Sequence, residues 1–258
     1  MIIGKSKKEL EKMRAAGQLV GHVREALRDL VVPGITTLEL DRAAEKMIRD
    51  AGALPTFKGY HGFPFSICAS VNEQVVHGFP SDRALVEGDI FSVDVGVTLD
   101  GYVGDTATTV PVGQVDDELL KLIAVTHECL ERGIAQCWPG KHVGDIGHAV
   151  QSYAETFGYG IVRDYVGHGI GRKMHEAPQI PNYGKPGTRE KIKAGYVFAI
   201  EPMINLGTQN TKVLKDKWTV VTIDGKPSAH AEHTIAITEE GPEVLTRVAA
   251  NQPAAAGA

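Results

Sequence analysis

The chain has 258 residues, of which 43% are hydrophobic and 23% charged, a balance typical of globular proteins that excludes a disordered or fibrous chain. Its 27 Lys and Arg against 32 Asp and Glu give a formal net charge of -5, so we do not expect sequence-specific nucleic-acid binding. The three cysteines include no C-x-x-C pair, which predicts neither a disulfide framework nor a cysteine zinc site. The sequence shows no signal-peptide pattern and no long apolar run. These features predict a cytoplasmic protein without a membrane partner.

Two capping boxes mark the first predicted helices. Ser6 with Glu9 precedes apolar residues at spacings of three and four, which predicts an amphipathic helix that ends before Pro33 and Gly34. Thr36 with Glu39 opens a second helix, which ends near Gly52.

Residues typical of β-strands follow from about Ile67. Strands are predicted over 90–97, 102–110, 218–223 and 229–238, and Asp-Gly pairs at 100–101 and 224–225 predict hairpin turns. Residues 251–258 have little to bury, so we expect a flexible tail there.

The chain resembles itself. Residues 32–34 (Val-Pro-Gly) correspond to residues 138–140 (Trp-Pro-Gly), and the segment 88–94 corresponds to 195–201, with a carboxylate at the end of each. Chance similarity of amphipathic segments is the alternative, but the matches occur in a consistent order. We therefore predict one α/β (α+β) domain, residues 1–250, with pseudo-twofold halves of about 1–112 and 113–248. The paired strands should form one continuous sheet.

Asp94 and Asp105 are the first candidate metal ligands. Asp94 alternates with apolar residues along its strand and so points away from the apolar face. If the turn is the two-residue loop at 100–101, Asp105 lies on the same face, with the two Cβ atoms about 7 Å apart or less. Carboxylates so close repel unless a cation lies between them, and a metal pair about 3.5 to 4 Å apart would fit.

Three further residues complete a candidate ligand set. The repeat makes Glu201 the counterpart of Asp94, and Glu232 the expected counterpart of Asp105. Glu232 also shares strand parity with His230. His168 lies between glycines that allow close backbone approach, and imidazole is a common nitrogen ligand for first-row metals. Each acidic residue alone would be read as a surface charge, whereas all five together indicate a metal site.

The motifs that carry a family resemblance run in order through residues 4–248: Val76-His77-Gly78, Asp94-Val95-Gly96, Gly104-Asp105-Thr106, Gly167-His168-Gly169-Ile170-Gly171, Met174-His175-Glu176, Ala199-Ile200-Glu201-Pro202 and Ala231-Glu232-His233. The sequence resembles the type I methionine aminopeptidases of the short bacterial kind, which are metallopeptidases with the pita-bread fold. The resemblance implies a central, mainly antiparallel sheet covered by helices. The resemblance implies two divalent ions, with Asp94 on the first, Asp105 and Glu232 bridging both, and His168 with Glu201 on the second.

The resemblance also implies roles in catalysis and substrate binding. A water or hydroxide shared by the ions would attack the scissile carbonyl, with Glu201 as proton shuttle and His77 and His175 contacting the substrate. The pocket for the methionine side chain would be lined by Tyr60, Phe63, Cys68 and Trp218, with His77 at its rim. Phe57 and Met174 occupy positions that vary in the family, which leaves the depth of the pocket open.

The implied function is removal of the initiator methionine from nascent proteins when the second residue is small. The ligand types suit Mn(II), Fe(II), Co(II) or Zn(II) without selecting one. The implied partners are nascent polypeptide N-termini, with any ribosome contact made by the catalytic domain, and the expected state is a monomer. A proline-directed peptidase of the same fold is an alternative, although such relatives usually carry a large N-terminal domain. A non-catalytic binding protein is another, which the intact ligand set disfavours.

Overall fold

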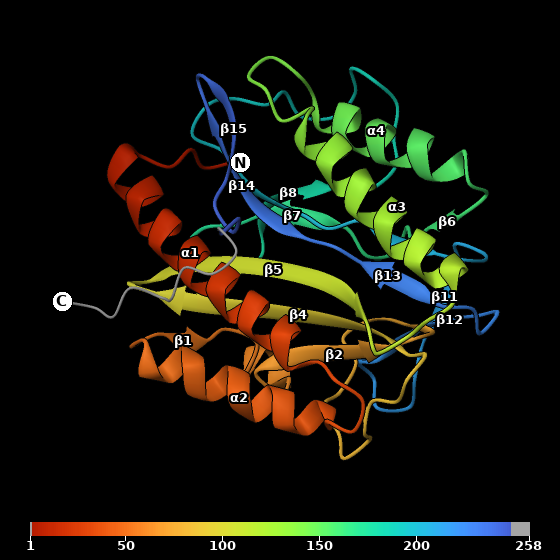
Figure 1. Cartoon of the computed structure of the whole chain (residues 1–258). Helices are drawn as coiled ribbons and strands as arrows, with labels where there is room; N and C mark the ends of the chain where they lie inside the picture. Colours follow the sequence, from red (N-terminus) through yellow and green to blue (C-terminus); the bar gives the residue numbers. More distant parts are fainter. Residues whose placement is uncertain (1, 249–258) are drawn as a thin grey trace.

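The computed structural model describes residues 2–248, and the predicted tail at 251–258 lies outside the described residues. Four α-helices lie on the outside of a set of antiparallel strands (Figure 1). Their bounds are α1 (Lys7–Leu30), α2 (Thr37–Asp50), α3 (Asp117–Ile134) and α4 (Val143–Glu155), with a short 3-10 helix η1 (Tyr60–Gly62). Over residues 2–248, none of the helices has both the length and the apolar character needed to cross a membrane.

Local hydrogen bonds explain where the predicted helices begin. The Ser6 hydroxyl accepts the backbone N–H of Glu9, whose carboxylate accepts the backbone N–H of Ser6, so the predicted capping box is present. Thr36 and Glu39 form the same reciprocal pair at the start of α2. Both predicted helices are therefore confirmed.

The strands form four antiparallel sheets rather than the single continuous sheet that we expected. The four-stranded sheet contains β1 (Leu54–Pro55), β2 (Ile67–Val71), β4 (Ile90–Leu99) and β5 (Tyr102–Pro111), and the five-stranded sheet contains β7 (Gly167–Gly169), β8 (Glu176–Ile180), β9 (Val197–Ile200), β14 (His233–Thr238) and β15 (Gly241–Val244). Two three-stranded sheets contain β6 (Gly160–Ile161), β10 (Met203–Asn205) and β13 (Ser228–His230), and β3 (Gln74–Val76), β11 (Thr211–Val213) and β12 (Val220–Thr222).

The division of the sheet has a local cause. The run predicted as one strand over 229–238 separates into β13 and β14, because Glu232 between them pairs with Ala107 of β5. Their two backbone hydrogen bonds, at 2.9 and 3.4 Å, connect the two larger sheets at this point. The mixed α/β class with antiparallel strands is nevertheless as predicted.

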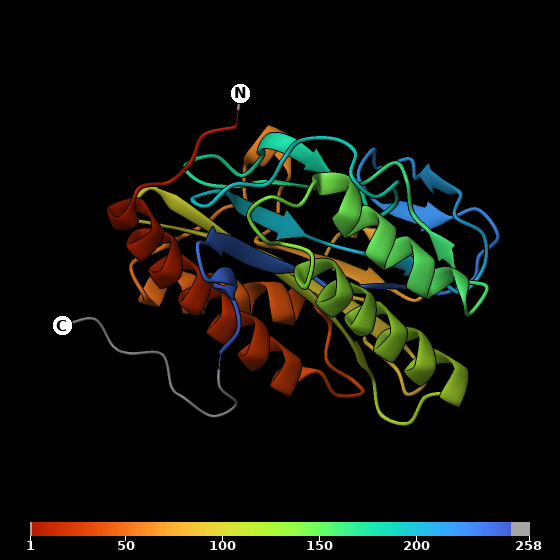
Figure 2. The same ribbon diagram turned by 90° about the horizontal axis from the view of Figure 1, so that it is seen from above.

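The internal repeat is visible in the backbone. Gly34 and its counterpart Gly140 have φ of 99° and 94°, and Gly88 and Gly195 have φ of 93° and 87°. Such left-handed conformations favour glycine because a Cβ atom would clash. Figure 2 shows α1 and α3 lying across neighbouring parts of the strand layer, each belonging to one half of the chain. The limits of the single predicted domain stay a prediction.

The two predicted Asp-Gly turns have different outcomes. At 100–101 both residues have positive φ, 50° and 76°, and Leu99 pairs with Tyr102, so this hairpin is confirmed. The turn at 224–225 is not a hairpin, since β12 pairs with β3 and β11 while β13 pairs with β10. The Asp224 carboxylate instead accepts backbone N–H groups of Thr208 and Lys226, which turns the chain toward another sheet.

Candidate metal centre

Three of the five candidate ligands lie on strands, and the other two lie directly beside strand ends. In the hairpin of β4 and β5, Asp94 lies opposite Ala107 and Asp105 lies opposite Gly96, so both carboxylates project from one face, as the spacing predicted. His168 belongs to β7, Glu201 follows the last residue of β9, and Glu232 lies between β13 and β14. The ladders among these strands bring residues from both halves of the chain to one place.

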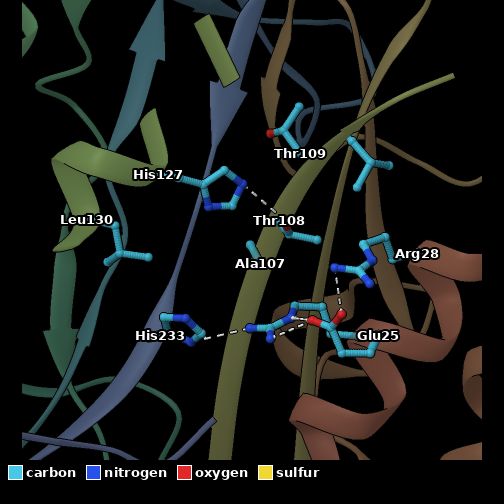
Figure 3. Close-up of a pocket in the computed structure, with 10 residues that line it drawn as sticks. Glu25, Arg28, Ala107, Thr108, Thr109, His127, Leu130 and His233 are labelled. Carbon is cyan, nitrogen blue, oxygen red and sulfur yellow. Dashed lines mark hydrogen bonds and ion pairs between the residues drawn. The ribbon is translucent and has the colours of Figure 1, made fainter. Parts of the chain in front are cut away.

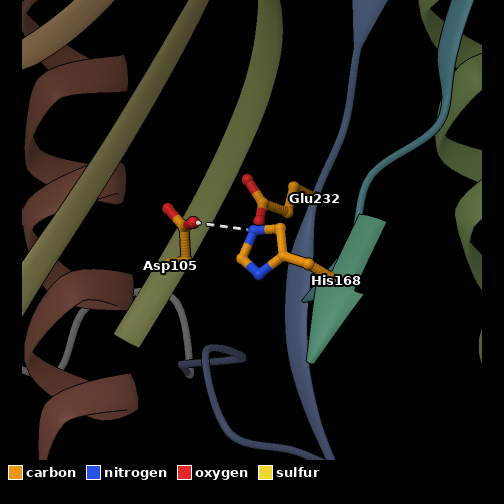
Figure 4. A group of neighbouring side chains, drawn as sticks. All are labelled: Asp105, His168 and Glu232. Atoms are coloured by element: carbon orange, nitrogen blue, oxygen red, sulfur yellow. Dashed lines mark ion pairs between the residues drawn. The ribbon is translucent and has the colours of Figure 1, made fainter. Parts of the chain in front are cut away.

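The distances define a compact cluster. Ligand atoms of Asp105, His168 and Glu232 all lie within 4.8 Å of one another (Figure 4). The Nε2 atom of His168 is 3.7 Å from Asp105 Oδ2 and 3.6 Å from Glu201 Oε1. Asp94 shares the sheet face of Asp105, and its charge raises the pKa of Asp105.

Burial and mutual repulsion favour the protonated forms of the carboxyl groups in this cluster. Burial raises the pKa of Asp94 from 3.8 to about 7. The pKa of Asp105 is raised well above its usual value by burial and then by the charges of Asp94 and Glu201, and burial likewise raises the pKa values of Glu201 and Glu232. Within residues 2–248, Asp94 Oδ1, Asp105 Oδ1 and Glu232 Oε1 are buried without a hydrogen-bond partner.

These features fit a divalent metal ion. Buried carboxylates need a positive partner, and hard cations favour oxygen ligands supplemented by imidazole. Burial also lowers the pKa of His168 to about 3, so its imidazole is neutral and has a lone pair available for a metal. The carboxylate oxygens without hydrogen-bond partners and the combination of carboxylate and imidazole ligands therefore both indicate a cation site.

A histidine lies on the open side of the cluster. His175 belongs to the connection between β7 and β8, is exposed, and has its ring centroid 4.3 Å from that of His168. Its Nδ1 is 2.7 Å from the hydroxyl of Tyr60 in η1. This contact fixes the orientation of an imidazole that is otherwise open to solvent.

Aromatic side chains form one wall beside the cluster. The rings of Phe63 and Trp218 have centroids 5.1 Å apart, and those of Trp218 and His77 are 6.2 Å apart. Burial lowers the pKa of His77 to about 4, so this imidazole is also neutral. The residues expected to line a methionine pocket therefore lie together, with Tyr60 and Cys68 in the same hydrophobic cluster.

Cys68 connects this wall to the metal cluster. It pairs with Asp94 in the ladder of β2 and β4, and burial followed by the charge of Asp94 raises the pKa of its thiol. A protonated, buried thiol is a poor nucleophile, so Cys68 acts as a small apolar residue.

Gly96 lies beneath Phe57 and Met174, where a Cβ atom would be 2.7 Å from Phe57 Cε1 and 3.3 Å from Met174 Cε.

Two polar residues at the centre were not singled out by sequence reasoning. The Thr234 hydroxyl donates to the carbonyl of Asp105 at 2.8 Å, which holds the strand that carries Asp105. His230 is 2% exposed, and its Nε2 lies 3.9 Å from Glu201 Oε2. Strand parity with Glu232 was the signal that could have identified both.

A cavity of about 250 Å³ lies beside β5 (Figure 3). None of the five candidate ligands is among its lining residues, so it is separate from the cluster. Arg24 in its wall donates from Nη1 to the Thr106 hydroxyl at 2.7 Å, and that hydroxyl donates to the carbonyl of Glu232 at 2.8 Å. Arg24 and Thr106 thus support the backbone next to Asp105 and Glu232.

Sequence relatives and solved structures similar to this chain belong to the same group of proteins. The sequence profile of metallopeptidase family M24 matches residues 11–239. Methionine aminopeptidase 1 of Bacillus subtilis is 52% identical over 248 residues, which cover 96% of this chain and 100% of that protein. The crystal structure of methionine aminopeptidase from Rickettsia prowazekii has a TM-score of 0.94 at 46% identity, covering 96% of this chain and 100% of that one.

More distant structures share the architecture. The prolidase from Pyrococcus horikoshii OT3 has a TM-score of 0.78 at 21% identity, and the match covers 96% of this chain and 65% of the prolidase. At this identity the likeness shows the fold alone.

Proposed function

Since the chain belongs to metallopeptidase family M24, we propose that its buried cluster binds two divalent metal ions and that its substrates are proteins with a small second residue. The family, the fold class and the release of N-terminal methionine were indicated by the motifs and are confirmed by relatives about 52% identical over nearly the whole chain. Use of a divalent metal follows from the family. The number of ions and the role of each residue below are our proposal.

Asp94 would hold one ion, His168 and Glu201 the other, and Asp105 and Glu232 both. The clustering of Asp105, His168 and Glu232 supports this assignment, as do the carboxylate oxygens that lack partners within residues 2–248. When bound, such ions polarise the substrate carbonyl and lower the pKa of water. Four carboxylates would compensate the charge of two divalent cations.

The remaining steps fall to side chains of this chain. Glu201, whose pKa is raised by burial and by Asp94, suits a group that accepts and returns a proton. If the Tyr60 hydroxyl donates a hydrogen bond to His175 Nδ1, the proton of the neutral imidazole lies on Nε2. That N–H can then donate a hydrogen bond to the substrate oxygen. His77, neutral and beside Trp218, would contact the substrate next to the methionine pocket.

The methionine side chain of the substrate would pack against the aromatic wall. Phe63 and Trp218 are in edge-to-face contact, and Tyr60 and Cys68 belong to the same cluster. Thioether sulfur is attracted to the edges of aromatic rings. Phe57 and Met174 pack above Gly96 at the base of this cluster and would set the depth of the pocket.

In the cell, the natural substrates would be nascent polypeptide N-termini, and we place the enzyme in the cytoplasm as a monomer. The formal net charge of -5 supports a protein rather than a nucleic acid as the partner.

The single observation that carries the proposal is the buried group of Asp105, His168 and Glu232 in a chain of this family. Its test is to compare Met-Ala-Ser, Met-Arg-Ser and Ala-Pro-Ser peptides with Mn(II), Co(II), Fe(II) or Zn(II), alongside metal quantification. We expect release of methionine from Met-Ala-Ser only, with two ions bound per chain. Equal turnover of Met-Ala-Ser and Met-Arg-Ser would contradict the rule for the second residue.

The same panel tests the two alternatives. Cleavage of Ala-Pro-Ser without cleavage of Met-Ala-Ser would favour a proline-directed peptidase. A folded chain that is inert on all three peptides would favour a non-catalytic binding protein.

A further inference from the structure

Glu201 lies between two imidazoles. Its Oε1 is 3.6 Å from His168 Nε2, and its Oε2 is 3.9 Å from His230 Nε2. The His230 side chain is 2% exposed, and among residues 2–248 its Nε2 has no hydrogen-bond partner. A buried polar atom without a partner is costly, and here it is close to a carboxylate oxygen.

We propose that His230 is a positioning residue, whose Nε2–H donates to Oε2 of Glu201 and so holds Oε1 toward His168 and the metal. The inference rests on the proposed function, because it assigns a metal-binding role to Glu201. Hydrogen bonds to the outer atoms of metal ligands orient those ligands and tune metal affinity.

The backbone on each side of this contact is fixed. The backbone N–H of His230 donates to the Thr109 hydroxyl at 2.8 Å, and that hydroxyl donates to the carbonyl of His230 at 2.8 Å. The carbonyl of Glu201 accepts from the Asn182 amide at 3.0 Å. Side-chain rotation alone therefore has to bring Nε2 and Oε2 from 3.9 Å to a hydrogen-bond distance of about 3 Å.

The state of the imidazole suits a donor. A neutral imidazole carries one N–H, which can lie on either ring nitrogen. Placing that proton on Nε2 gives both buried atoms a partner. The carboxylate of Glu201 then has one oxygen for the metal and one for His230.

The test compares His230→Gln, which keeps a donor, with His230→Leu, which removes it. His127→Leu is the matched control, because His127 is a half-buried histidine in the wall of the separate cavity beside β5. Metal-free proteins are titrated with Co(II) against a competing chelator, and kcat and KM are measured on Met-Ala-Ser at saturating metal. Thermal unfolding of each metal-free variant checks its fold.

We expect His230→Leu to bind Co(II) about 10 to 100 times more weakly than wild type, and its kcat to change by a larger factor than its KM. His230→Gln should keep a Co(II) affinity within a few-fold of wild type. His127→Leu should leave both values unchanged. Wild-type affinity in His230→Leu would overturn the proposal. An equal loss of Co(II) affinity in His230→Gln and His230→Leu would also overturn it. A changed Co(II) absorption spectrum in His230→Gln would overturn it as well, because it would make His230 a metal ligand instead.

Two further controls keep the outcomes distinct. If His230→Leu does not fold, His230→Met provides the apolar comparison with the same expected result. Failure of the wild-type protein to bind metal or release methionine would refute the proposed function. A normal wild-type protein with an unaffected His230→Leu variant would refute only the role of His230.

Discussion

The ammonium group of Lys5 lies 2.6 Å from the carboxylate of Glu176, and the two side chains are only 5% and 17% exposed. The pair joins the segment before α1 to the start of β8, next to His175. Gly171 packs against it, since a Cβ atom there would be 2.4 Å from Lys5 Cε and 2.6 Å from Glu176 Oε1. The N-terminal segment is thereby tied to the loop that presents His175.

Replacing one member of this pair should be costly. Lys5→Met leaves the half-buried carboxylate of Glu176 without its cation, and we expect a loss of about 1 to 3 kcal/mol in the free energy of unfolding. Urea denaturation of the metal-free proteins measures it, with the exposed Lys8→Met as control. The double variant Lys5→Met with Glu176→Met should recover much of the loss. A single variant as stable as wild type would contradict the importance of the pair.

The proposed bridging role of Asp105 and Glu232 predicts that metal content and activity disappear together. Asp105→Ala or Glu232→Ala would remove a ligand of both ions and leave the other buried carboxylates repelling one another. Metal analysis after gel filtration, together with methionine release, measures the effect. The exposed Asp82→Ala should behave as wild type. Normal occupancy of both sites in either variant would rule out bridging.

Metal binding should stabilise the protein more as the pH rises. Because the pKa of Asp94 is raised from 3.8 to about 7, this group stabilises the metal-free fold at acid pH, and that contribution is lost as pH rises through this range. Metal binds the ionised carboxylates and displaces their protons, so its stabilising effect should increase over the same range. In the folded protein His168, with a pKa lowered to about 3, is already neutral over this range, so it does not add to the pH dependence of the metal effect.

Thermal unfolding with and without Mn(II) across this pH range measures the difference. Calorimetry in two buffers of different ionisation enthalpy detects the released protons. Equal heats in the two buffers, or a metal effect that does not change with pH, would contradict the expectation.

Local patterns predicted the part of the site that depends on neighbouring residues. Alternation along β4 and the turn at 100–101 were sufficient to place Asp94 and Asp105 on one face, because a two-residue hairpin fixes its own register. The same reasoning failed for the turn at 224–225, since a turn signal does not specify which strands pair. The pair of Lys5 and Glu176 spans 171 residues, and no periodicity in the sequence relates them.

The contact between His230 and Glu201 was beyond sequence reasoning for a related reason. It depends on β13 pairing with β10, which places His230 opposite Met203, just after Glu201 in the chain. The break between β13 and β14 at Glu232 also depends on β5, far away in sequence. The repeat identified which residues correspond between the halves, but not which polar side chains meet between them.

His175 provides the sharpest separation of metal binding from stabilisation of the transition state. It is exposed, its ring lies 4.3 Å from that of His168, and its Nδ1 contacts the Tyr60 hydroxyl. As a donor to the oxyanion that forms when the carbonyl is attacked, it should matter most as charge develops. We expect His175→Ala to lower kcat by about 10² to 10³ while metal content stays the same.

Tyr60→Phe should cause a smaller loss of kcat than His175→Ala, because it removes only the group that orients the imidazole. The exposed His148→Ala serves as control and should leave kcat unchanged. The measurement pairs kcat with metal stoichiometry for every variant. An unchanged kcat in His175→Ala would make the residue a surface histidine, and the loss of a metal ion would make it a ligand; either result refutes its assignment as an oxyanion donor.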